Sequence, residues 1–261
     1  MNYIEISSRN NDKIKYAAKL VSSAKERNAA SLFVCEGLRL CSDAVYSGYT
    51  VKELYVTSEA LSKNPEKIGE ISEKSESVYL INDAVKEKLS DTVNSQGVFV
   101  VAEMKQNESP DIGAGKKYVA LDCVQNPQNL GAAARTAEAL GIAALIVSGG
   151  CDIYNPKALR ASMGSLLRIP VIKTDDLCKL INDFNKMGVL TFSTVPDSRA
   201  VDITTLDFSK GALAVIGNEG NGVSQQVKKA ASVLATIKMA GNAESLNASS
   251  AAVITMWEMM K

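Results

Sequence analysis

The second half of the chain repeats one pattern, a short apolar strand followed by a helix. The strands are continuously apolar rather than alternating, which is typical of strands buried on both faces of a parallel sheet. The predicted strands cover 118–124, 143–148, 167–172, 189–195, 212–216 and 233–238, and the predicted helices cover 130–140, 156–163, 175–187, 223–230 and 245–260. This pattern predicts an α/β domain with ligands bound beyond the carboxyl ends of its strands.

The first part of the chain has shorter helical and extended segments. We expect helices at 12–27, 37–47, 63–74 and 82–90, and strands at 32–35, 54–57, 78–81 and 98–102. A polar stretch broken by Pro110, Gly113 and Gly115 follows, as is typical of a linker. The sequence therefore predicts a small α/β domain at 1–104, a linker at 105–117 and a larger α/β domain at 118–261.

The chain contains no histidine. This excludes Ser-His-Asp and Cys-His catalysis and the usual zinc sites, so we expect no metal. The five cysteines are an odd set with no close pairing, which is typical of reduced thiols. No apolar run approaches the roughly 18 residues of a membrane span, and the N-terminus lacks a targeting pattern. These features predict a cytoplasmic protein without a membrane segment.

The overall charge does not favour nucleic acid as a partner, because the net charge is zero and the pI is about 6.4. Locally, however, the stretch at 9–27, which contains the first predicted helix, is basic. It carries six cations against Asp12 and Glu26: Arg9, Lys13, Lys15, Lys19, Lys25 and Arg27. Two interpretations stay open, a solvated helix face or a strip that binds phosphate groups.

The loop after the strand at 118–124 leads into a helix with many small residues. Asn129 is placed to cap this helix, because its side-chain oxygen can accept a hydrogen bond from a free N–H of the first turn. Arg135 points away from the apolar face of the helix. It is either an ordinary solvated arginine or a functional one.

The loop after the strand at 212–216 has the spacing G-x-x-G-x-G over 217–222. This spacing matches neither the dinucleotide fingerprint nor the P-loop. Its glycines allow a tight turn that exposes backbone N–H groups, either as a plain structural turn or for a ligand. Glu219 lies in the middle of the loop, where its carboxylate would face the ligand crevice.

The loop after the strand at 233–238 ends with polar residues at the start of the last helix. Ser245, Asn247 and Ser249 stand there. Capping by Ser245 would explain one of these residues but not all of them. The predicted last helix then carries an apolar face made of Val253, Met256, Trp257 and Met260.

Together the three loops resemble the ordered motifs of the SpoU-type RNA 2′-O-methyltransferases, also called the TrmH family. The matching stretches read Asn129-Leu-Gly-(x)₃-Arg135, Ile216-Gly-Asn-Glu-Gly-(x)-Gly222 and Ile237-(x)-Met-(x)-Gly-(x)₃-Ser-Leu-Asn-(x)-Ser249. This resemblance covers about 118–260. The stretches at 7–10 and 33–37 are similar to the family's substrate-binding domain, whose fold is related to kink-turn-binding ribosomal proteins.

The resemblance implies a catalytic domain of the SPOUT type with a trefoil knot, a rare exception to the rules of chain topology. It also implies a homodimer formed through the knotted domain. The implied activity is methyl transfer from S-adenosyl-L-methionine to a ribose 2′-hydroxyl in RNA, with 23S rRNA favoured over tRNA. The implied cofactor-binding residues are Thr194, Gly217, Asn218, Gly220, Ile237, Met239 and Leu246.

The implied catalytic residues are Arg135, Asn129, Glu219, Ser245 and Asn247. In the family the arginine that matches Arg135 activates the ribose hydroxyl. An ordinary arginine stays protonated, with a pKa above about 12, so the role fits an electrostatic activator better than a base. The other residues would order the pocket. One departure is Asn126, which stands where the family often has an acidic residue.

Two alternatives belong to other functional classes. A non-catalytic RNA-binding or ribosome-assembly protein could use the same fold, but the presence of Arg135, Glu219 and Asn247 argues against it. An unrelated nucleotide-dependent enzyme such as a dehydrogenase would need G-x-G-x-x-G after its first strand, and this motif does not follow Val124.

Overall fold

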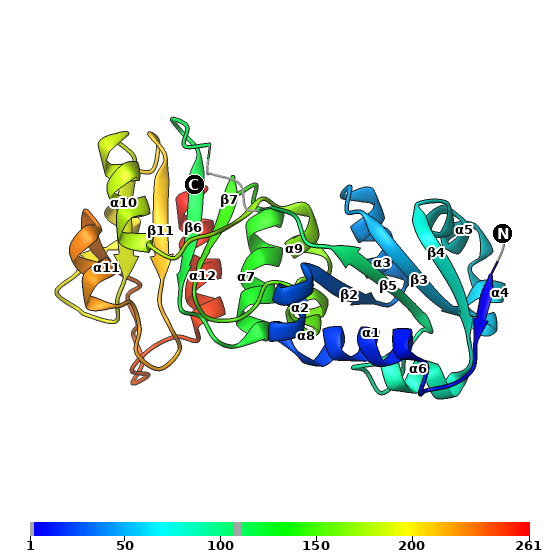
Figure 1. Ribbon diagram of the computed structural model, residues 1–261. Coiled ribbons are helices and arrows are strands. Elements are labelled where there is room, and N and C mark those ends of the chain that lie inside the picture. The colour runs from blue at the N-terminus through cyan, green and yellow to red at the C-terminus, as the bar shows by residue number, and fades with distance from the viewer. Residues whose placement is uncertain (1–2, 107–110) are drawn as a thin grey trace. The chain divides into compact units, whose positions relative to one another are not determined.

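The computed structural model describes residues 3–106 and 111–261 (Figure 1). The chain forms two compact units. The first contains residues up to Gln106 together with Tyr154–Arg168, and the second contains 107–153 and Ile169–Lys261. Residues 107–110 of the predicted linker lie outside the described part of the chain.

A mixed five-stranded sheet forms the first unit, in the order β1-β4-β3-β5-β2. Its strands are β1 (Ile4–Ile6), β2 (Leu32–Glu36), β3 (Val51–Thr57), β4 (Ser75–Ile81) and β5 (Val98–Glu103). Its helices are α1 (Asp12–Ser22), α2 (Ala24–Ala30), α3 (Leu38–Tyr46), α4 (Ser58–Lys63), α5 (Pro65–Glu73), α6 (Asp83–Leu89), α8 (Pro156–Ala161) and α9 (Ser165–Arg168). Strand β4 is parallel to β1 and β3, whereas β5 is antiparallel to β2 and β3.

One predicted helix is divided in two, and an additional helix precedes another. The expected helix at 12–27 is broken at Ser23, whose extended backbone ends α1 and whose side chain caps α2. The expected helix at 63–74 is α5 alone, and α4 precedes it, separated from it by Asn64. Proline at the first position of α5 explains the break, because the residue before a proline avoids the helical region.

The segment Tyr154–Arg168 packs with the first unit although the sequence pattern assigned it to the domain at 118–261. Tyr154 stacks on Phe33 of β2, with ring centroids 4.4 Å apart, and meets Tyr49 edge to face at 6.5 Å. These contacts bury apolar rings that would otherwise face water.

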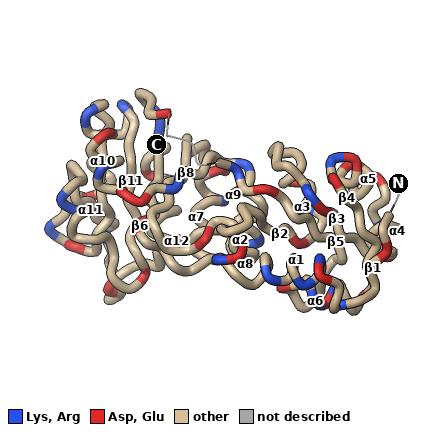
Figure 2. The backbone as a smooth tube through the Cα atoms, viewed as in Figure 1, with Lys and Arg blue, Asp and Glu red and all other residues tan. Residues whose placement is uncertain are grey.

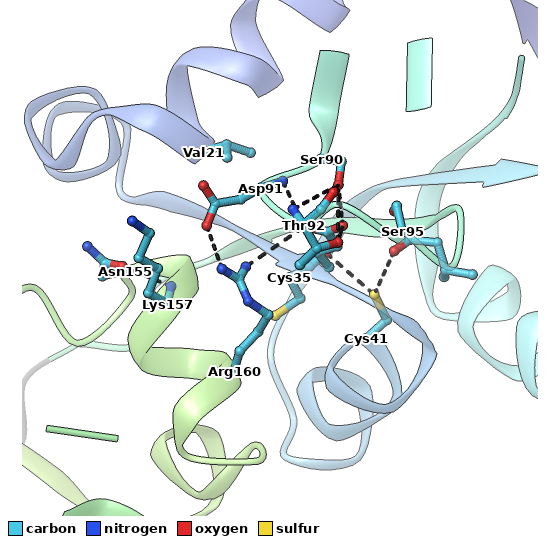
Figure 3. A network of polar contacts seen from close by, with 12 residues as sticks. Val21, Cys35, Cys41, Ser90, Asp91, Thr92, Ser95, Asn155, Lys157 and Arg160 are labelled. Atoms are coloured by element: carbon cyan, nitrogen blue, oxygen red, sulfur yellow. Dashed lines mark hydrogen bonds and ion pairs between the residues drawn. The ribbon is translucent and has the colours of Figure 1, made fainter. Parts of the chain in front are cut away.

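Figure 3 shows the polar network that holds α8 in this position. The guanidinium of Arg160 lies 2.5 Å from a carboxylate oxygen of Asp91. The nearby carboxylate of Glu36 accepts hydrogen bonds from the hydroxyls of Ser90 and Thr92 and from the backbone N–H of Asp91. Because the Glu36 side chain is only 7% exposed, these bonds are needed to offset its lost hydration.

A seven-stranded, wholly parallel sheet forms the second unit, in the order β10-β12-β9-β11-β6-β7-β8. Its strands are β6 (Lys117–Asp122), β7 (Ala144–Ser148), β8 (Val171–Lys173), β9 (Leu190–Thr194), β10 (Val201–Asp202), β11 (Ala212–Ile216) and β12 (Val233–Thr236). Its helices are α7 (Pro127–Ala139), α10 (Leu177–Lys186), α11 (Gln225–Ala230) and α12 (Ala248–Met259), with a 3₁₀ turn, η1 (Ile203–Thr205).

Helices cover both faces of this sheet (Figure 1), which confirms the predicted architecture. On one face, Tyr118 of β6 meets Phe184 of α10 edge to face at 4.9 Å. On the other, α12 packs against α7, β11 and β6. The strands are therefore apolar on both sides, as the unbroken apolar runs indicated.

One predicted strand is placed differently, and one strand of each sheet has no predicted counterpart. The expected strand at 167–172 is in fact the end of α9 followed by the short β8, and Pro170 lies between them. The additional strands are β1 and the two-residue β10. Both are very short, so their apolar pattern is too brief to register as a strand. No helix in the described residues is long and apolar enough to cross a membrane.

The basic strip expected along α1 is much reduced in the structure. Figure 2 shows acidic positions interspersed with the basic ones on α1 and α6. The side chains of Arg9, Lys13 and Lys15 form ion pairs with Glu87, Glu53 and Asp12 at 2.7, 2.9 and 3.3 Å. Within the described residues, only Lys19 and Lys25 of this set have no side-chain partner. The interpretation as an ordinary solvated face is favoured.

Arg27, the last cation of the expected strip, is buried instead of exposed. Arg27 is buried in the first unit, with 2% of the residue exposed. Its guanidinium donates to the backbone oxygens of Leu20 and Val21 at 2.7 and 3.1 Å. These oxygens belong to the last turn of α1, where carbonyl groups lack partners within the helix. Arg27 therefore caps the C-terminus of α1 and cannot contact RNA.

We expect Arg27→Met to lower the free energy of unfolding by about 2 kcal/mol, because two buried carbonyls lose a charged donor. Lys25→Met is the matched control on the same helix, where the side chain is exposed, and should change stability by no more than about 0.5 kcal/mol. Urea denaturation of the full chain measures both. Equal effects of the two substitutions would contradict a capping role for Arg27.

Candidate cofactor and catalytic site

A cavity of about 290 Å³ opens at the carboxyl ends of the strands of the second unit. It is lined by the ends and following loops of β9, β11 and β12, by α11 and by the start of α12. All seven residues predicted to bind the cofactor line it, and so do two predicted catalytic residues: Thr194, Gly217, Asn218, Gly220, Ile237, Met239, Leu246, Glu219 and Ser245. Residues far apart in sequence thus share one cavity.

The loop at 217–222 is a tight turn held by its own backbone. Asn218 and Gly222 exchange two backbone hydrogen bonds of 3.1 and 2.9 Å, and Gly222 has a positive φ of 65°. The side-chain oxygen of Asn218 accepts from the N–H groups of Gly220 and Asn221. A Cβ on Gly217 would lie 2.1 Å from backbone atoms of Gly222, so only glycine fits there.

The carboxylate of Glu219 ties this turn to the start of α7. One oxygen accepts from the Gln125 backbone N–H at 3.1 Å, and the other from the Asn126 N–H at 3.0 Å and the Asn129 side-chain amide at 2.8 Å. Partial burial by itself raises the pKa of Glu219, but these hydrogen bonds outweigh it and leave the pKa below its ordinary value. The carboxylate is thus a fixed anion that joins two loops.

The prediction that Asn129 caps α7 is wrong. The helix begins at Pro127, and Asn126 caps it by accepting from the Gln128 N–H at 2.8 Å. Proline favours the first helical position, which moves the cap to the residue before it. Asn129 lies in the first turn instead, buried, with its amide on Glu219. Asn126 caps as well as an acidic residue would, without placing a second negative charge beside Glu219.

At the start of α12 the open alternative of capping by Ser245 is ruled out. Asn247 is the cap, and its side-chain oxygen accepts from the N–H of Ser249 at 2.9 Å and of Ser250 at 3.4 Å. Ser245 lines the cavity instead. Asn247 thereby fixes the backbone next to Leu246, a wall of the cavity.

Arg135 lies apart from the cavity wall. It is exposed on α7, six residues after Asn129, which corresponds to about 9 Å along the helix axis. Among the described residues its guanidinium has neither an ion pair nor a hydrogen bond. This cation is therefore available to a group outside the protein.

Two further residues shape the site without having been predicted. Asp122, at the end of β6, is buried and accepts from the Ser224 N–H at 2.9 Å, which anchors the exit of the glycine turn. Lys228 of α11 forms part of the cavity wall. Asp122 could have been noticed as a carboxylate at a strand end, whereas Lys228 lies on a short helix of ordinary composition after the glycine turn and gave no signal of its own.

We expect Glu219→Gln to destabilise the chain by about 1 kcal/mol at neutral pH, because an amide nitrogen would face backbone N–H donors. Since the folded pKa lies below the unfolded value, the carboxylate's contribution is complete above pH about 4.3 and is lost as pH falls through the folded pKa. Thermal unfolding of both proteins between pH 3 and 7 checks this. A stability difference that stays constant down to the lowest pH would contradict it.

Comparison with known proteins identifies both parts of the chain. Residues 116–257 match the SpoU rRNA Methylase family, and residues 11–100 match the MRM3-like substrate binding domain. The chain is 29% identical over 256 residues to the 23S rRNA (guanosine(2553)-2′-O)-methyltransferase RlmP of Bacillus subtilis, with 98% of each protein covered. It is 30% identical to the 23S rRNA (guanosine-2′-O-)-methyltransferase RlmB of Xanthomonas campestris, covering 81% of this chain and 88% of that protein.

A solved structure shows the same fold over nearly the whole chain. The AdoMet-bound rRNA methyltransferase from Sinorhizobium meliloti superposes with a TM-score of 0.84 at 30% identity, covering 98% of this chain and 97% of the other. The family match spans more than half of the sequence and contains every residue of the cavity wall. The chain belongs to the SpoU rRNA Methylase family and carries an MRM3-like substrate binding domain ahead of the methylase part.

Proposed function

We propose that the chain transfers a methyl group from S-adenosylmethionine to a ribose 2′-hydroxyl of 23S rRNA. One observation carries the proposal: the residues of the second and third motifs form the wall of one cavity, and Glu219 joins that wall to the first motif at Asn129. The relatives named above are 23S rRNA 2′-O-methyltransferases, which supports the same substrate class here.

The cavity suits S-adenosylmethionine in size and chemistry. Its volume is close to the lower end of the usual range for small-molecule pockets, about 300–1,000 Å³. Ile237, Met239 and Leu246 offer apolar contact for a flat base, and the glycine turn offers backbone polar groups. When bound, the cofactor supplies an electrophilic methyl group on a sulfonium. We assign its binding to the seven predicted residues that line the cavity.

Arg135 activates the ribose hydroxyl in this proposal. A hydroxyl becomes a competent nucleophile as it loses its proton, and a nearby guanidinium stabilises the negative charge that develops on the oxygen. Arg135 is exposed on α7 and has no partner within 3–106 and 111–261, so its donors are free for the RNA backbone. Glu219, Asn129 and Asn247 act through the loops that they hold, and Ser245 faces the cavity.

Each predicted domain has its own role in this proposal. We assign RNA binding to residues 1–104 and methyl transfer to residues 118–261, with 105–117 as the linker. The two family matches, over 11–100 and 116–257, support this division. The segment at 154–168 belongs to the catalytic stretch of sequence but packs with the RNA-binding unit. We also propose a cytoplasmic location, which an rRNA substrate supports.

The methylase part works as a homodimer, and α12 forms part of the interface. This proposal follows from the resemblance to the family, which implies a trefoil knot and a dimer in which two knotted regions face each other. The predicted apolar face of the last helix is partly exposed: Val253, Trp257 and Met260 are 37, 58 and 39% exposed, whereas Met256 is buried. Three exposed apolar side chains spaced four and three residues apart form one stripe that a second copy can cover.

We expect Arg135→Ala to abolish methyl transfer, with a loss of at least about a hundredfold, while folding and cofactor binding stay nearly unchanged. The control is Lys179→Ala, which removes an exposed cation from α10 of the same unit. Transfer of labelled methyl groups to 23S rRNA, followed by mapping of 2′-O-methyls, measures the effect. Activity of Arg135→Ala at the wild-type level would remove Arg135 from the mechanism, and RNA binding by the wild type without transfer would contradict the proposed function.

Trp257 is the only tryptophan, so its fluorescence reports directly on the proposed interface. We expect the emission of the wild type to shift to longer wavelength on dilution, as the dimer dissociates and water reaches the ring. Trp257→Glu should shift sedimentation toward the monomer, whereas Met187→Glu, at an exposed apolar residue away from α12, should not. A wild type that sediments as a monomer at every concentration would overturn the dimer.

A further inference from the structure

The side chain of Lys228 places a positive charge in the wall of the cofactor cavity. Lys228 lies on α11 and lines the same cavity as Gly217, Met239 and Leu246. Within the described residues its ammonium group makes no ion pair and no hydrogen bond. A cation in a partly enclosed wall has lost part of its hydration, and this loss is offset only when an anion comes near.

One acidic residue that interacts with Lys228, Asp197, already has another cationic partner. The charge of Lys228 is felt at Asp197, whose pKa is about 2, but the main cause of that low pKa is Arg199. Both oxygens of Asp197 accept from the Arg199 guanidinium, at 3.1 and 2.9 Å, and one also accepts from the Arg199 backbone N–H at 2.9 Å. Asp197 is therefore paired chiefly with Arg199, and its interaction with Lys228 is the weaker one and involves no ion pair among the described residues.

Glu219, which supplies the carboxylate in the cavity wall, also has its hydrogen-bond partners already. Of the lining residues, Glu219 alone is acidic and Lys228 alone is basic. The Glu219 oxygens accept from two backbone N–H groups and from Asn129. The carboxylate of Glu219 is thus already hydrogen-bonded to neutral donors. The ammonium group of Lys228, in the same cavity wall, has no hydrogen-bond acceptor among the described residues. A ligand with a carboxylate complements this arrangement.

We infer that Lys228 binds the carboxylate of the amino-acid part of S-adenosylmethionine and so selects for ligands that carry it. The inference rests on the proposed function. The lining includes the apolar side chains of Ile237, Met239 and Leu246, which come from the segment between β12 and α12, whereas Lys228 comes from α11. The adenosine part then occupies the apolar wall and the amino-acid part reaches α11.

An RNA phosphate is the competing anion, and the cavity wall favours the cofactor. Lys228 shares its cavity with all seven residues assigned to the cofactor. Arg135, the residue assigned to the RNA, is not part of that wall. The RNA and the cofactor carboxylate are therefore expected to engage different cations of the chain.

Calorimetric titration of the full chain with two ligands tests this. S-adenosylhomocysteine carries the carboxylate, whereas 5′-methylthioadenosine keeps the adenosine and the sulfur but lacks the amino-acid part. For Lys228→Met we expect S-adenosylhomocysteine to bind about tenfold more weakly, while the affinity for 5′-methylthioadenosine changes less than about twofold. Lys228→Arg, which keeps the charge, should restore most of the loss.

Lys229→Met is the matched control, since its side chain is exposed on the same helix and does not line the cavity. If Lys228→Met lowered the affinity for both ligands equally, the side chain would shape the cavity rather than attract the carboxylate, and the inference would be overturned. An unchanged affinity for S-adenosylhomocysteine combined with weaker binding of 23S rRNA would overturn it in favour of a phosphate. If the wild type binds neither ligand, the proposed function itself fails, which is a distinct result.

Discussion

The hydrogen bonds to Glu219 are the interaction on which the rest of the site depends. Its carboxylate joins the glycine turn after β11 to the first turn of α7 through three donors. The Asn218 side chain, which donates to the Cys123 backbone oxygen at 2.8 Å, and Asp122, which accepts from the Ser224 N–H, also join the turn to the end of β6. Glu219 is the group that links the turn directly to the helix that carries Arg135, and ionised acceptors make the stronger hydrogen bonds.

The sheet makes this interaction possible. Strands β9, β11 and β6 are neighbours, and β12 pairs with β9, so all four end at the same edge. Parallel strands bring segments far apart in sequence to one edge, where short loops can meet. Gly217 is needed at this edge because the turn folds back on itself within contact distance. The cavity is thus a consequence of strand order combined with one tight turn.

Much of this arrangement was predictable because it depends on local patterns. The apolar runs indicated a parallel sheet with two covered faces, and the ordered motifs indicated which loops would share a cavity. Several local predictions failed: the helix expected at 12–27 is broken, and the strand expected at 167–172 is the end of α9 followed by β8. Asn126 caps α7, where Asn129 was expected, and Asn247 rather than Ser245 caps α12, because a cap depends on where a helix begins. Several polar residues in a row leave that start undetermined.

By itself, the sequence determined the fold class, the position of the motifs and the chemistry available without histidine, since periodicity and residue type act locally. Only the tertiary structure decided how side chains are partnered. In the sequence Arg27 resembles any exposed cation, and only its contacts show that it caps α1. Lys228 is an ordinary lysine in the sequence, and only the structure shows it in the cavity wall. Residues 154–168 group with the first unit for the same reason. Burial and charge compensation arise from contacts between distant segments, and the linear order of residues does not contain those distances.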